Sequence, residues 1–353
     1  MTNPSQGFIN FYEKCLVSKR FRFIDYFQEQ FDYQSPIKYE VQFHSSPPKQ
    51  LISLCNAILK NLHSNSFFEN NAAADIEYLH FIQIYGPLYF LIKEVVLNQT
   101  YDENWMTRLI ILLYLSKERF SQEVFDTFFI RLNSVKIADS KILSQHDYTV
   151  ELEELYLKII HNDKIRNISV NVIKTINSFN KQHVDYDVNK IKLVFFIDQL
   201  DGLFGFAGID SIYVSLNTFS KLNMNLDKES KMIILKLDFI RLIQHELTHV
   251  LLRESADDVN ISTPDILNNN NRDELIKESG IIAEVTHFGG RIDWVESSFS
   301  NQLNFVYCND YIKRIEANEQ VNFDIEKANI ILNSSEICCM ALDMTTKKKV
   351  SYQ

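Results

Sequence analysis

The sequence predicts a mostly α-helical protein of the α+β class, built in two parts. Residues 1–185 read as a succession of helices, whereas six of the eight glycines fall between residues 202 and 290, close to two β-rich segments. Clustered glycines are typical of short strands and turns rather than of long helices. We therefore expect a helical domain over residues 1–185 and a second domain with a small sheet over residues 186–353.

In the first part, apolar residues recur at mixed spacings of three and four, the pattern of amphipathic helices. Proline-containing or polar segments separate most of these stretches and interrupt the helical pattern. Helices are expected over residues 7–31, 49–62, 75–96, 104–132 and 150–176. The sequence does not indicate a role for this part.

In the second part, β-branched and aromatic content predicts a strand over residues 191–197, and alternation predicts another over residues 211–216. We expect these two strands to form a hairpin or an adjacent pair. Ser230 is the expected N-cap of a long helix from Lys231 to about Glu254. A capping-box-like start at Asn271 predicts a further helix over Arg272 to His287, ending at two glycines.

Charge and cysteine content narrow the function classes. The chain carries 36 Lys and Arg against 46 Asp and Glu, a net charge of −10, which is the wrong sign for binding a nucleic-acid backbone. The five cysteines form no CxxC pair, and the start of the chain lacks the basic and apolar regions of a signal peptide. We expect reduced thiols, a cytoplasmic location, no nucleic-acid partner and no membrane association.

The most informative segment is His245-Glu246-Leu-Thr-His249, an HExxH motif on the expected long helix. Two histidines four residues apart project from one helical face and can bind one Zn²⁺, while Glu246 can act on a water molecule. A helical projection places both histidines opposite an apolar stripe, on a side expected to face a cleft. The stripe consists of Ile240, Ile243, Leu247, Val250 and Leu251.

This stretch resembles the active helix of the zincin metallopeptidases. The metzincin branch is disfavoured because Leu252 and Ser255 occupy the positions of its glycine and third histidine. The peptide deformylases are disfavoured because their Glu-Gly-Cys segment is not found. The remaining resemblance is gluzincin-like and implies a zincin-like domain in which a downstream helix supplies a glutamate as the third ligand.

Two glutamates on the expected helix are candidates for that ligand. Glu278 lies within an apolar stripe of that helix, whereas Glu284 lies on the other side. A carboxylate on an apolar stripe is costly unless it is paired or bound to a metal, which favours Glu278. Glu278-Ser-Gly280 also resembles the Asn-Glu-Gly segment of gluzincin aminopeptidases. Glu284 remains the alternative ligand, or a residue that orients a histidine.

The resemblance implies a zinc-dependent metallopeptidase with one Zn²⁺ per chain, bound by His245, His249 and Glu278. Glu246 is the expected general base in peptide-bond hydrolysis, and the partner is a peptide or protein substrate. The strand over residues 211–216 is expected to pair with an extended substrate. Two alternatives remain open: a catalytically inactive, zincin-like scaffold that binds a partner, and an enzyme inhibited by its helical half.

Overall fold

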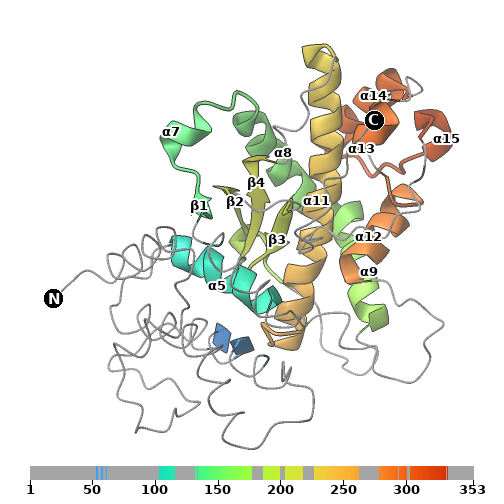
Figure 1. The fold of residues 1–353 in the computed structure, drawn as a ribbon. Coiled ribbons are helices and arrows are strands. Elements are labelled where there is room, and N and C mark those ends of the chain that lie inside the picture. Colours follow the sequence, from blue (N-terminus) through green and yellow to red (C-terminus); the bar gives the residue numbers. More distant parts are fainter. Residues whose placement is uncertain are drawn as a thin grey trace, which may run out of the picture. The chain divides into compact units, whose positions relative to one another are not determined.

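Figure 1 shows the computed structural model, which describes residues 103–115, 134–176, 186–198, 203–217, 226–261, 278–292, 294–299 and 303–330, with positions 53, 54, 57, 58, 61, 132 and 332. The chain divides into two compact units. Residues 136–343 form one unit, and residues 1–135 with 344–353 form the other. The expected boundary after residue 185 therefore lies inside the larger unit.

In the smaller unit, helix α5 (Glu103–Leu115) occupies the first part of the helix expected over residues 104–132. Its apolar residues from Leu109 to Leu113 are buried. The described positions between 53 and 61 are also helical. The helices expected over residues 7–31 and 75–96 lie outside the described residues.

The larger unit contains a four-stranded mixed sheet with strand order β1-β2-β4-β3. Its strands are β1 (Lys136–Ile137), β2 (Lys192–Ile197), β3 (Gly205–Ala207) and β4 (Ser211–Ser215). The two expected strands are present as β2 and β4, and they are adjacent and parallel. They do not form a hairpin, because the short antiparallel strand β3 connects them and returns along the outer side of β4.

The helix expected over residues 150–176 is two helices, α8 (Thr149–His161) and α9 (Asp163–Ile176). They meet at Asn162, whose backbone is extended and ends α8. The Asn162 side-chain oxygen accepts hydrogen bonds from the backbone N–H groups of Lys164 (3.1 Å) and Ile165 (3.3 Å). These bonds cap α9 and make the break favourable, because they satisfy donors that a helix start leaves unpaired.

The central element is α11 (Lys228–Ala256), the long yellow helix of Figure 1. It packs against strands β3 and β4 and against α8, α9, α12 (Ser279–Phe288), α13 (Trp294–Phe299) and α14 (Phe305–Glu316). Its N-cap is Asp227 rather than Ser230, because the Asp227 carboxylate accepts the Ser230 backbone N–H at 2.8 Å. Almost every residue from Ile233 to Arg253 is buried.

Beyond α11, helix α12 ends at Gly289, which adopts a left-handed conformation (φ 76°) that favours glycine. The protein is thus mostly helical with a small mixed sheet, as the sequence predicts. None of the helices in the described part of the chain has both the length and the apolar character needed to cross a membrane.

Candidate metal centre

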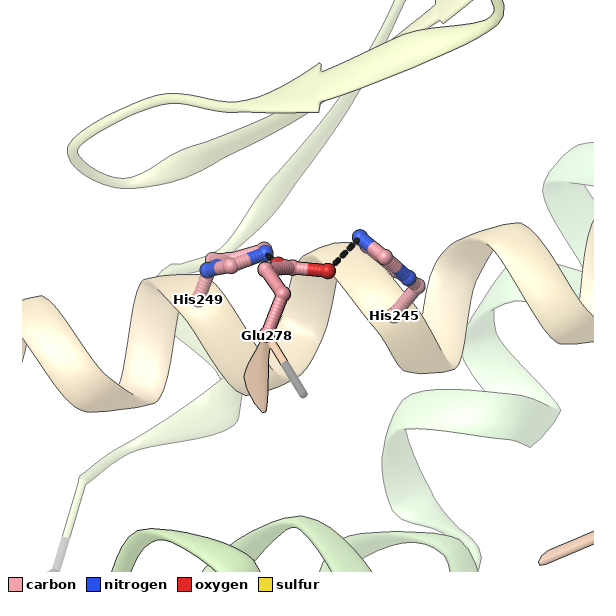
Figure 2. A group of neighbouring side chains, drawn as sticks. All are labelled: His245, His249 and Glu278. Carbon is pink, nitrogen blue, oxygen red and sulfur yellow. Dashed lines mark ion pairs between the residues drawn. The ribbon is translucent and has the colours of Figure 1, made fainter. Parts of the chain in front are cut away.

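The structure brings His245, His249 and Glu278 together. One potential ligand atom from each lies within 4.8 Å of the others. Figure 2 shows the Glu278 carboxylate between the two imidazoles. Its Oε2 lies 3.3 Å from His245 Nε2, and its Oε1 is paired with His249 Nε2. Both histidines therefore direct the same ring nitrogen towards one carboxylate.

Glu278 reaches this position from the N-cap of α12, not from within a helix. Its backbone angles are φ −52° and ψ 144°, which are not helical, and α12 begins at Ser279. The expectation that Glu278 lies on a helical apolar stripe is therefore wrong. Residues 272–277 of the expected helix lie outside the described residues. The position of Glu278 is therefore set by the start of α12.

Only one of the two oxygens of the Glu278 carboxylate has a close polar partner. Its Oε2 is buried and has no hydrogen-bond partner among the described residues, although His245 Nε2 is 3.3 Å away. Burial alone would raise the pKa of Glu278, but the nearby charges of His245 and His249 hold this pKa well below its usual value. A buried anionic oxygen without a hydrogen bond is costly, and a bound cation would satisfy it.

Behind His245 lies Glu284, which does not face the shared carboxylate. Its Oε1 accepts a hydrogen bond from His245 Nδ1 at 2.7 Å and another from the Arg241 guanidinium at 3.0 Å. Burial would raise the pKa of Glu284, but Arg241 and His245 lower it below its usual value. An ionised Glu284 holds the proton of His245 on Nδ1, which leaves the lone pair on Nε2 for a metal.

The first turn of α12 also contacts both histidines. The Ser279 hydroxyl lies 3.3 Å from His249 Nδ1. A Cβ atom at Gly280 would lie 2.5 Å from three ring atoms of His245, so only glycine lets the helix approach this ring. Neither contact follows from the HExxH motif, although the Glu278-Ser-Gly280 segment contains both residues.

The two histidines are more enclosed than the helical projection suggests. They lie opposite the apolar stripe of α11, but α12 packs on that side, so His245 is 2% exposed and His249 is 8% exposed. Glu246 is also buried. Burial raises the pKa of Glu246, against the opposing effect of the His245 and His249 charges. A base with a raised pKa retains a proton more readily near neutral pH.

A second buried hydrogen-bond chain crosses the same helices. His287 Nδ1 is paired with Gln244 Oε1, and its Nε2 lies 2.6 Å from the Tyr311 hydroxyl. Burial lowers the pKa of His287 to about 3, so the ring is neutral. With the amide oxygen as acceptor, His287 donates from Nδ1 and accepts the Tyr311 proton at Nε2. This chain links α11, α12 and α14.

The strand expected to pair with a substrate is not at an edge of the sheet. β4 is hydrogen bonded to β2 on one side and to β3 on the other. The expectation for residues 211–216 is therefore wrong, because the main-chain groups that a substrate would use are already paired. The edge beside α11 belongs to β3.

Comparisons with known proteins add no relative. No protein-family model matches the chain, and no curated protein or solved structure matches it.

Proposed function

We propose that the protein is a zinc-dependent metallopeptidase in which His245, His249 and Glu278 bind one Zn²⁺. The observation that carries the proposal is the convergence of both HExxH histidines on a carboxylate from a separate segment. One oxygen of that carboxylate is buried without a hydrogen bond from the described residues. Two nitrogens and one oxygen are the ligands of many catalytic zinc sites, where the fourth position is left for water or substrate.

The chain's own residues have distinct roles in this proposal. Glu284, held by Arg241, fixes the orientation and the tautomer of His245. Bound Zn²⁺ would supply the Lewis acidity that polarises the peptide carbonyl and acidifies water. Glu246 accepts the proton of the attacking water and delivers it to the leaving amine.

Metal content tests the ligand set first. We expect about one zinc per chain in the wild type, and loss of that zinc in His249→Ala and Glu278→Ala. His161→Ala and Glu319→Ala are matched controls, because both residues are exposed and lie outside the cluster. A wild type that binds no zinc after reconstitution, or a Glu278→Ala variant that retains it, would contradict the site.

Cleavage of a randomised peptide library tests the reaction. We expect the zinc-loaded wild type to cleave peptides, and Glu246→Gln to retain zinc while losing turnover. Equal cleavage by Glu246→Gln would contradict Glu246 as the general base. A wild type that binds zinc and cleaves nothing would favour the alternative of a catalytically inactive scaffold.

A further inference from the structure

Ser279 follows Glu278 directly and is the first residue of α12, where it is fully buried. Its hydroxyl oxygen lies 3.3 Å from Nδ1 of His249. This ring nitrogen is not the one that is paired with Glu278, and Figure 2 shows that it points away from the carboxylate. When Nε2 of His249 binds a metal, Nδ1 is therefore left facing the Ser279 hydroxyl.

The location of the ring hydrogen decides whether His249 can bind a metal through Nε2. A neutral imidazole carries one ring hydrogen, so Nε2 has a free lone pair only when the hydrogen is on Nδ1. In that tautomer Nδ1 is a donor, and a hydroxyl oxygen can accept its hydrogen bond. A bond from His249 Nδ1 to the Ser279 oxygen therefore favours the metal-binding tautomer and fixes the orientation of the ring.

The two histidines have different partners at the same ring position. His245 Nδ1 donates to the ionised Glu284 carboxylate at 2.7 Å, whereas His249 Nδ1 faces a neutral hydroxyl at 3.3 Å. Hydrogen bonds to charged groups are shorter and about twice as strong as bonds between neutral groups. We therefore expect the Ser279 hydroxyl to orient its histidine less strongly than Glu284 orients His245.

We propose that Ser279 is a positioning residue for the metal centre. Its hydroxyl accepts the Nδ1 hydrogen of His249 and so keeps Nε2 of this ring directed at the metal position. The inference rests on the metal site of the proposed function, but not on peptide cleavage. In this arrangement, Glu278 supplies a ligand and the next residue in the chain orients the ligand beside it.

The zinc affinity of Ser279→Ala tests this role. Alanine removes only the hydroxyl oxygen and is favourable in a helix. We expect the zinc dissociation constant, measured by competition with a chelating dye, to rise about tenfold, because removal of an orienting partner costs about 10–100-fold and this partner is neutral. Ser279→Thr retains a hydroxyl and should bind zinc more tightly than Ser279→Ala. An affinity of Ser279→Ala within about twofold of the wild type would overturn the proposal.

Ser169→Ala is the matched control for a purely structural role. Ser169 is also fully buried, and its hydroxyl is hydrogen bonded to the Thr248 hydroxyl of α11 at 2.9 Å. We expect both alanine variants to be less stable than the wild type in urea unfolding of the metal-free proteins, because each loses a buried hydrogen bond. Zinc affinity should fall only in Ser279→Ala. An equal fall in both variants would show that Ser279 is only structural.

A measurement on the wild type decides the proposal even if no variant folds. In the zinc-loaded protein, NMR should show a nuclear Overhauser effect between the Nδ1 hydrogen of His249 and the β hydrogens of Ser279, and its absence would overturn the proposal. A wild type that binds no zinc would contradict the metal site and this inference together. A wild type that binds zinc and cleaves no peptide would contradict the peptidase function alone, and the zinc affinities would still decide the role of Ser279.

Discussion

Replacing Gly280 by alanine has two opposing effects on stability: alanine favours the helix more than glycine does, but its Cβ atom would clash with the His245 ring. In an ordinary helix, a change from glycine to alanine stabilises the folded protein by about 1 kcal/mol, because alanine loses less conformational entropy on folding than glycine does. Here the new Cβ would lie 2.5 Å from three ring atoms of His245, about 1 Å inside a normal carbon contact. Overpacking of this kind costs about 1–3 kcal/mol. We therefore expect destabilisation where propensity alone predicts a gain.

A double-mutant cycle measures the contact directly. In a His245→Ala background the clash disappears, so Gly280→Ala should stabilise the metal-free protein by about 1 kcal/mol. The coupling between the two positions should then be about 1–3 kcal/mol, obtained from urea unfolding of all four proteins. In the His245 protein, displacement of the ring should also weaken zinc binding by about tenfold or more. A coupling below about 0.5 kcal/mol would refute the reasoning, because additive changes imply no contact.

Two further predictions concern the groups behind the candidate metal centre. Glu284→Gln should weaken zinc binding about 10–100-fold in a competition titration with a chelating dye, whereas the control Glu254→Gln, on α11, should not. Equal affinities of wild type and Glu284→Gln would exclude Glu284 as the group that orients His245. Because the pKa of His287 falls from 6.5 to about 3 on folding, only the unfolded state takes up this proton between those pH values. His287 should therefore reduce the free energy of unfolding by about 1.4 kcal/mol for each pH unit below 6.5. In His287→Gln, the free energy of unfolding should fall less steeply with decreasing pH, because this contribution is lost. The measurement is urea unfolding of both proteins at several pH values after a chelator has removed bound metal. An unchanged dependence on pH would contradict a neutral, buried His287.

The sequence pattern indicates part of the candidate site because His245, Glu246 and His249 lie close together on one helix, α11. The spacing of His245 and His249 fixes their common direction in any helix, whatever surrounds it. The structure places Glu278, and not Glu284, beside the Nε2 atoms of both histidines, but the helical projection behind the choice of Glu278 does not apply. Glu278 lies at the N-cap of α12, where its direction is set by the helix start rather than by a 100° step.

The features that the sequence does not predict depend on contacts between segments far apart in the chain. The spacing of apolar residues in one sequence does not reveal such contacts. β3 is three residues long, so it has too little alternation to be recognised as a strand. Because β3 is not recognised, no sequence pattern places β4 in the interior of the sheet. The bond from Arg253 to Ala207 joins residues 46 positions apart. An arginine one turn beyond His249 is the only local signal of that contact.

The geometry of the candidate metal centre depends on how α12 lies against α11, and both ends of α12 constrain it. At its start, Gly280 rests against the His245 ring and Ser279 lies beside His249. Near its other end, His287 is bonded to Gln244 and Tyr311, so charging that ring would break the link between the three helices. A helix held at both ends cannot rotate without losing one of these contacts. The direction of Glu278 towards the histidines is therefore a consequence of how α12 packs, and not of the motif on α11 alone.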